Sequence, residues 1–372
     1  IRRPPRSTQS RSSAASDVYK RQTIFLWLCL DFIVTKTLGS RGFSQFYESS
    51  EIEGRKNKDD FEGVFSMWLD EFNGLVSIES FGERKSLKEG CEKITNTTLF
   101  LGDSSTAGFE VNDNQTFVSV YNQDCQKYKR KGLNFGVRAH DTHAVLGSYM
   151  RIKDLFNHDL VVYLLTPNDF SENINPNAYQ IMSKRFGRRF DGKLIPPVEN
   201  YGFKLYADLR LFIGDNLSTT TYILARLPRG IRSILTFFSN SESNDYQFIS
   251  KNLIDKQVDK TLELITTLEV EIIANGAQLI VIPHPCLDNK KRCAVDRDEQ
   301  NESLAKMIKS KLKHTTFIDL QSSVEKQVKR DGFLIGEMRF RNDSHLSKYG
   351  HKVLGKLISE AIFQQSLIQN NY

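Results

Sequence analysis

The chain has 372 residues, a formal net charge of +6 and 39% hydrophobic residues. Residues 1–22 contain six Lys or Arg and one Asp, so they account for five of the six net positive charges and the rest of the chain is nearly neutral. The basic balance is therefore no evidence for nucleic acid as a partner, and the length suffices for one large domain or two ordinary ones.

The first 22 residues, IRRPPRSTQSRSSAASDVYKRQ, show neither a helical nor a strand period. Such a segment cannot build a core. It resembles the conceptual translation of a sequencing adapter, and we leave it out of the fold prediction. The alternative is an authentic basic, disordered arm.

The next segment, residues 23–39, is apolar from Ile24 to Val34 apart from Asp31. It is shorter than the ~20 residues that a membrane span needs, and we interpret it as a truncated transmembrane anchor or signal segment. An all-round apolar core helix is the alternative. Its orientation stays open, because the positive-inside rule compares both flanks of a span and we expect one of them to be lost.

After a polar lead-in over residues 40–96, the pattern changes to short apolar runs separated by helical patterns. Runs bounded by Gly, Pro, Asn or Asp are typical of strands that are buried on both faces. The predicted strands cover residues 97–102, 132–137, 159–166, 277–283 and 316–320.

Two amphipathic helices are predicted most clearly, at residues 254–274 and 348–363. Strands alternating with helices indicate an α/β fold with a doubly wound, mostly parallel sheet of about five strands. Such sheets bind ligands beyond the carboxyl ends of their strands.

The stretch LFLGDSSTAGFEV, residues 99–111, has polar side chains at such a strand end. Gly102 permits a sharp turn that would expose Ser104. A serine nucleophile needs a base within hydrogen-bond reach, and that base needs an acceptor to orient it.

The candidate pair is in NDSHLSKYGH, residues 342–351, before the last helix. Residues two apart do not face each other on a helix, so Asp343 and His345 are expected in a loop. There Asp343 can turn back onto one imidazole nitrogen and leave the other for Ser104. His351, one turn into the helix, is expected to be structural.

Four blocks, LFLGDSSTAG, NFGV, VVYLLTPNDF and NDSHLSKYGH, resemble in order those of the SGNH hydrolase superfamily, the GDSL-type esterases. The resemblance covers about residues 97–363 and implies a hydrolase domain of that fold over residues 97–366. It implies Ser104 as nucleophile, His345 as general base and acid, and Asp343 as its orienter. It also implies the oxyanion donors: the backbone N–H groups of Ser104 and Gly136 and the side-chain amide of Asn168.

The sequence departs from the family pattern at three points. Ser105 replaces the usual leucine and is a minor rival nucleophile, and Thr166 replaces a usual glycine. The acid lies two residues before His345, where many members have three, and at that spacing the residue would be Asn342. The two-residue spacing resembles acyltransferase-like and membrane-anchored branches, and a dyad without a true acid is the alternative.

A long insertion is predicted at residues 170–253. It contains SKRFGRRFDGK, whose cations include Arg185 and Arg188. This segment is interpreted either as a cationic, aromatic substrate rim or as a solvated hairpin that turns at Asp191-Gly192.

Two further clusters contain possible metal ligands. In HDTH, residues 140–143, an N-cap role for Asp141 or Thr142 is favoured over metal binding. In HPCLDNKKRC, His284 follows the fourth predicted strand and is a candidate for the cleft rim, but the spacing matches no common zinc pattern. Cys286 and Cys293 can form a disulfide if the domain is exported.

The sequence therefore predicts a serine esterase or O-acyl transferase that forms an acyl-enzyme. The expected substrates are short-chain esters, such as O-acetyl groups of a cell-surface glycan or lipid. We expect no cofactor, no metal and no nucleic acid partner, and a membrane-anchored, periplasmic location. The alternative is a non-catalytic glycan-binding or assembly protein with the same fold.

Overall fold

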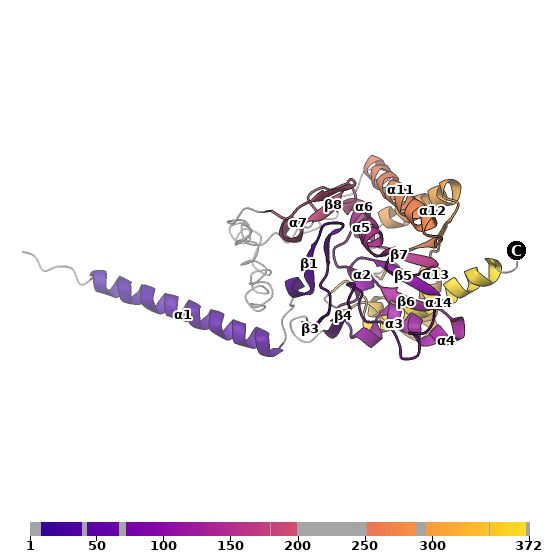
Figure 1. Ribbon diagram of the computed structural model, residues 1–372. Helices are drawn as coiled ribbons and strands as arrows, with labels where there is room; N and C mark the ends of the chain where they lie inside the picture. Colours follow the sequence, from indigo (N-terminus) through magenta and orange to yellow (C-terminus); the bar gives the residue numbers. More distant parts are fainter. Residues whose placement is uncertain are drawn as a thin grey trace, which may run out of the picture.

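The computed structural model describes residues 9–38, 43–66, 72–178, 180–198, 251–287, 295–341 and 343–369. Its first element, α1 (Gln9–Leu38), is drawn apart from the rest of the chain in Figure 1. Among the described residues, no helix is both long enough and apolar enough to cross a membrane.

A five-stranded sheet lies at the centre of the fold, in the order β11-β10-β7-β5-β6, and every pair of neighbours is parallel. This confirms the predicted α/β class with a parallel sheet. The strands are β5 (Thr97–Gly102), β6 (Lys131–Asn134), β7 (Leu160–Leu165), β10 (Gln278–Pro283) and β11 (Thr315–Phe317).

Side chains alternate between two hydrophobic clusters along these strands, because successive strand residues point to opposite faces. In β7, Val161, Tyr163 and Leu165 belong to one cluster, whereas Val162 and Leu164 belong to the other. All six residues of β7 are buried, so the continuous apolar run reflects a strand that is covered on both sides.

Helices cover both faces (Figure 1). On one face, the cluster includes residues of α5 (Thr142–Ile152), α11 (Lys251–Ala274) and α12 (Val295–Lys311). On the other face, it includes residues of α3 (Phe117–Tyr121), α13 (Gln321–Arg330) and α14 (Lys348–Gln369). The two helices predicted from periodicity are therefore α11 and α14, one on each face.

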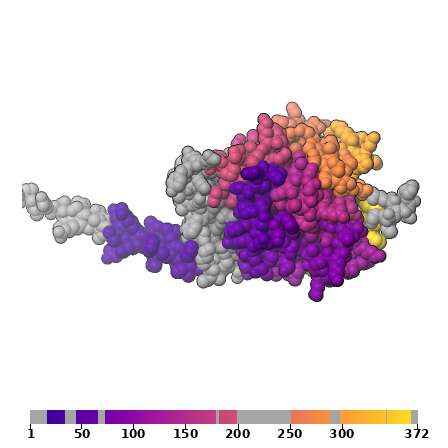
Figure 2. All heavy atoms as spheres, viewed as in Figure 1, coloured from indigo at the N-terminus to yellow at the C-terminus, as the bar shows by residue number. Residues whose placement is uncertain are grey.

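The lead-in forms two hairpins that pack on the domain (Figure 2). They consist of η1 (Phe43–Phe46), β1 (Tyr47–Ser50), β2 (Gly54–Asn57), β3 (Phe61–Ser66) and β4 (Asn73–Ile78). Phe46 and Phe65 pack on Phe109 and Val137, which come from the loops after α2 and β6. The lead-in thus supports the loops at the carboxyl edge of the sheet.

The remaining short elements lie in the connections between strands. They are α2 (Ser104–Ala107), η2 (Asp113–Gln115), η3 (Asn122–Asp124), α4 (Cys125–Tyr128), α6 (Pro167–Glu172), α7 (Gln180–Phe186), β8 (Arg188–Phe190), β9 (Lys193–Ile195) and η4 (Ile335–Met338). Most of the predicted insertion, residues 199–250, lies outside the described residues.

A disulfide joins Cys91 to Cys125, 34 residues apart, and ties the segment before β5 to α4. In a chain-entropy view, closing a loop of this length stabilises the fold by about 3–4 kcal/mol. Cys286 is disulfide-bonded as well, whereas Cys29 is a free thiol.

Candidate active site

The turn from β5 into α2 places Ser104 at the carboxyl edge of the sheet. Asp103 caps α2 by accepting a hydrogen bond from the N–H of Ser105 at 2.8 Å. A Cβ atom on Gly102 would lie 2.3 Å from Thr106 Oγ1 and 3.0 Å from Leu164 O. Only glycine therefore fits where the strand turns so closely into the helix.

Ser104 is half-buried, whereas every other residue from 97 to 111 is buried. Ser104 is therefore the one residue of this stretch that is not fully buried. Ser105, the rival nucleophile, has an exposed fraction of only 8%.

His345 approaches Ser104 from the loop between η4 and α14. Its Nε2 lies 2.8 Å from Ser104 Oγ, and its Nδ1 is hydrogen-bonded to Asp343 Oδ1. The same Asp343 oxygen accepts the backbone N–H of His345 at 2.9 Å. This backbone bond folds the loop so that an acid only two residues away reaches the imidazole.

Electrostatics prepares this pair for proton transfer. Burial opposes the charged form of His345, but the charge of Glu110 and the hydrogen bond and charge of Asp343 outweigh burial and the nearby Arg138, and raise the pKa of His345 above its usual value. Burial would also raise the pKa of Asp343, but its bonds to His345 hold that pKa well below its usual range. Asp343 is therefore ionised and accepts the Nδ1 proton.

The chain is similar in fold to several solved structures. Its structure matches a psychrotrophic esterase from Pseudoalteromonas (11% identity, 73% of this chain and 98% of the other, TM-score 0.39) and a GDSL-like lipase from Bacteroides thetaiotaomicron (12%, 73% and 89%, TM-score 0.37). It also matches a mutant of an acetyl-xylooligosaccharide esterase from Geobacillus (12%, 71% and 93%, TM-score 0.40). The sequence matches no protein-family model and no curated protein.

Two of the predicted oxyanion donors, Gly136 and Asn168, donate hydrogen bonds to other residues in the structure. The N–H of Gly136 donates to Asn134 Oδ1 at 3.0 Å, and a Cβ atom on Gly136 would lie 2.2 Å from the backbone N of Ala107. Gly136 thus packs closely behind α2 with its N–H bonded to Asn134, and its role as an oxyanion donor stays a prediction. Asn168, in the first turn of α6, donates from Nδ2 to Glu172 at 3.2 Å.

A buried polar network beneath the nucleophile was missed by the sequence analysis. Thr166 Oγ1 donates to Asp103 Oδ2 at 3.0 Å, and the N–H of Thr166 donates to Asp169 Oδ2 at 2.9 Å. Burial and the charge of Asp103 raise the pKa of Asp169 well above its usual value. The departure from glycine at position 166 thus supplies a hydroxyl that fixes the residue before the nucleophile.

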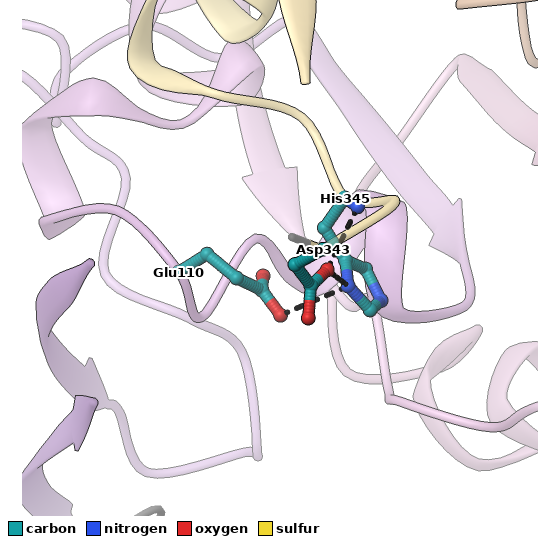
Figure 3. Close-up of side chains that lie close together, drawn as sticks. All are labelled: Glu110, Asp343 and His345. Carbon is teal, nitrogen blue, oxygen red and sulfur yellow. Dashed lines mark hydrogen bonds and ion pairs between the residues drawn. The ribbon is translucent and has the colours of Figure 1, made fainter. Parts of the chain in front are cut away.

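Glu110 is a second carboxylate beside His345 (Figure 3). Its Oε1 lies 3.4 Å from His345 Nδ1 and also pairs with Arg138 Nη1. The sequence gives one signal for this role: Glu110 is the first acid after the Gly-Asp-Ser turn. The salt-bridge partner lies 28 residues away, so sequence spacing could not identify it.

The structure contradicts the proposed cationic rim at Arg188. Arg188 is buried and pairs with Asp141, and it donates to the carbonyl of Asn175 at 2.8 Å. It therefore supports the fold beside α5 and does not face a substrate. The alternative, a hairpin turning at Asp191-Gly192, is what β8 and β9 form.

The other two rim candidates are Arg185 and His284. Arg185 is half-buried, with its guanidinium 5.5 Å from the ring centroid of Phe186. His284 directly follows β10 at the sheet edge and is 9% exposed, and its Nδ1 lies 2.8 Å from the carbonyl oxygen of Pro285. The substrate roles of Arg185 and His284 stay predictions.

Among the described residues, Glu110, Asp343 and His345 form the one cluster with the spacing of metal ligands. It coincides with the candidate site itself, where Arg138 already supplies a positive charge. In the HDTH segment, Asp141 caps α5 through the N–H of Ala144 at 3.0 Å, and His140 and His143 contact backbone carbonyls.

Proposed function

We propose that this protein is a serine esterase or O-acyl transferase that works through an acyl-enzyme on Ser104. One observation carries the proposal. Ser104 Oγ lies 2.8 Å from His345 Nε2, while Nδ1 of the same ring is held by an ionised Asp343. A nucleophile, a base and an orienting acid in this order are the requirements for covalent acyl transfer.

In the first half-reaction, His345 Nε2 takes the proton of Ser104 as Oγ forms a bond to the ester carbonyl carbon. The tetrahedral intermediate then collapses: the bond to the alkoxide breaks, and the imidazolium gives that alkoxide its proton. In the second half-reaction, an acceptor hydroxyl loses its proton to His345 and bonds to the acyl carbon; the bond to Ser104 Oγ then breaks, and the imidazolium returns the proton to Oγ. Water as acceptor makes the protein an esterase, and a sugar hydroxyl makes it a transferase.

The proposed substrates are O-acetyl and other short-chain esters of a cell-surface glycan or lipid. Support comes from the sequence resemblance to acyltransferase-like members, which includes the two-residue spacing of Asp343 and His345. The N–H of Ser104 and the amide of Asn168 are the proposed oxyanion donors. Asn168 would have to turn from Glu172 when the charged intermediate forms.

We further propose an extracytoplasmic, periplasmic location with membrane association through residues 23–39. The disulfides at Cys91–Cys125 and Cys286 support the location, because disulfides persist in oxidising compartments. Large apolar side chains of α1, such as Phe25 and Leu26, are each 70% exposed, which supports contact with lipid. Flotation of the full chain with lipid vesicles tests the association, and recovery of all protein in the unbound fraction would contradict it.

The decisive experiment measures hydrolysis of a chromogenic acetyl ester by the full chain and by Ser104→Ala and His345→Ala. We expect turnover by the parent and its loss in both variants, with an acetyl adduct on Ser104 in the mass spectrum of the quenched reaction. Unchanged turnover in Ser104→Ala would refute the serine mechanism. A folded parent with no turnover, no adduct and intact glycan binding would favour the alternative, a non-catalytic glycan-binding or assembly protein.

A further inference from the structure

Among the residues that the structure describes, Glu110 is the one buried carboxylate outside the predicted triad that faces the imidazole of His345. Its side chain is 0% exposed, and it lies in the turn after α2. Its Oε1 is 3.4 Å from His345 Nδ1 and pairs with Arg138 Nη1. Its Oε2 has no hydrogen-bond partner among the described residues.

An unpaired oxygen on a buried carboxylate is costly, and such a group in a folded protein calls for an explanation. A second buried pair in the same protein shows what a purely structural arrangement looks like. Glu53, also 0% exposed, receives Arg151 on Oε1 at 2.6 Å and Ser148 on Oε2. Both Glu53 oxygens are satisfied, whereas Glu110 is left incomplete beside the base.

The hydrogen on His345 Nδ1 is donated to Asp343, whereas Glu110 Oε1, at 3.4 Å, forms an ion pair with the ring. Glu110 therefore acts on the ring through its charge. That interaction is strongest when the ring is protonated, which happens each time His345 takes the proton of Ser104. Arg138 keeps the Glu110 carboxylate fixed and partly balances its charge.

Resting on the proposed function, we propose that Glu110 is a positioning residue, a second carboxylate that stabilises the imidazolium of His345 and can take the Nδ1 proton when Asp343 is absent. The charged groups that face this ring are then Asp343, Glu110 and Arg138, with His351 behind it. The protein would thus have two acids for one base.

The test compares Glu110→Gln with Glu53→Gln, a matched change in the structural pair. The pH dependence of Ser104 labelling by an alkyl fluorophosphonate is measured on the full chain, and the His345 ring is titrated by NMR. Removing the Glu110 charge destabilises the protonated ring, so the His345 titration and the acidic limb of labelling should move down by about one pH unit. Glu53→Gln should move neither.

A double variant tests whether Asp343 and Glu110 share the role of the acid beside His345. With Glu110 present, Asp343→Ala should lose about 10²-fold in labelling rate, well short of the ~10⁴-fold that loss of a sole triad acid costs. Adding Glu110→Gln should then reduce labelling to the level of His345→Ala. Equal labelling by Asp343→Ala and the double variant would overturn the proposal.

Glu110→Asp guards against a folding defect, because it keeps a charge for Arg138 while drawing the carboxylate back by one methylene. It should give a smaller shift of the His345 titration in the same direction. If Glu110→Gln and Glu110→Asp both titrate like Glu53→Gln, the proposal fails. A parent chain that is never labelled would count against the proposed function instead, and the NMR titration would still decide the role of Glu110.

Discussion

Two histidines six residues apart, His345 in the loop before α14 and His351 in its first turn, have opposite environments. His345 faces two carboxylates and the hydroxyl of Ser104, and these acids raise its pKa. His351 is buried, accepts the N–H of Phe117 on Nδ1 at 3.1 Å, and has its pKa lowered to about 3 by burial and the nearby Arg84.

The comparison shows that residue type and sequence neighbourhood do not decide which histidine is a base. Both belong to the block NDSHLSKYGH. The acids beside His345 raise its pKa, so this ring can gain and lose a proton near neutral pH. Burial keeps the other ring neutral, and it serves as a hydrogen-bond acceptor for α3. The predictions below either break this contrast or sharpen it.

The largest expected effect is on catalysis. His345→Ala should lower kcat for a chromogenic ester by about 10⁴-fold or more, because the base and its proton are lost together. His351→Asn, which keeps an acceptor for the Phe117 N–H, should leave kcat within about threefold and cost ~1–3 kcal/mol in urea unfolding. Comparable loss of kcat in two well-folded variants would show that the contrast is wrong.

The next effect is on the pH dependence of stability. The folded pKa of His351 lies below its unfolded value of ~6.5, so the unfolded chain binds the extra proton between about pH 6.5 and 3. Stability should therefore fall as the pH falls through this window, by on the order of 1 kcal/mol per pH unit. Urea unfolding of His351→Asn should show a flatter profile there than the parent.

His345 should act in the opposite sense. Its folded pKa is raised, so its stabilising contribution is complete below about pH 6.5 and disappears as the pH rises through the folded pKa. The difference between the parent and His345→Ala should thus shrink toward alkaline pH. A difference that instead grows with pH would mean that the two acids do not favour the protonated ring.

A smaller effect on stability is expected at Gly108, which lies close to His351. It adopts φ +60° at the end of α2, and its N–H donates to the carbonyl of Ser104 at 2.8 Å. A Cβ atom there would lie 2.9 Å from His351 Cε1. Gly108→Ala should cost about 2–3 kcal/mol.

Gly192→Ala is its control, since Gly192 has φ +72° with no atom within 4 Å of the added Cβ. That change should cost only about 1 kcal/mol, the backbone part of the penalty. The difference between the two variants in urea unfolding reports the contact with His351. Equal costs would mean that His351 yields to the methyl group.

The fold could be predicted well from the sequence because strands buried on both faces leave continuous apolar runs. The run at residues 159–166 became β7, and the helical periods at 254–274 and 348–363 became α11 and α14. The predicted strand boundaries were less accurate. The strand predicted at residues 132–137 is β6, which ends at Asn134. Gly136 lies beyond that strand and packs against the backbone of α2.

The site could be predicted only where short sequence motifs contain the residues that the chemistry needs. Ser104, Asp343 and His345 come together as expected, although their catalytic roles stay predictions. Arg188 looked like a surface cation because its partner, Asp141, lies 47 residues away. Glu110 and Arg138 were missed for the same reason, since a salt bridge between distant loops leaves no spacing to recognise.

The smallest expected effect is that of Ser105→Ala. Ser104 and Ser105 are adjacent in the sequence but differ in their environments, as His345 and His351 do. Ser104 is half-buried and bonded to His345, whereas Ser105 is buried and its N–H is held by Asp103. Ser105→Ala keeps that N–H and should leave kcat within about threefold, whereas Ser104→Ala should abolish turnover. Since the backbone bond to Asp103 survives in both variants, a large loss in Ser105→Ala would mean that its hydroxyl takes part in the reaction and that exposure is a poor guide to the nucleophile here.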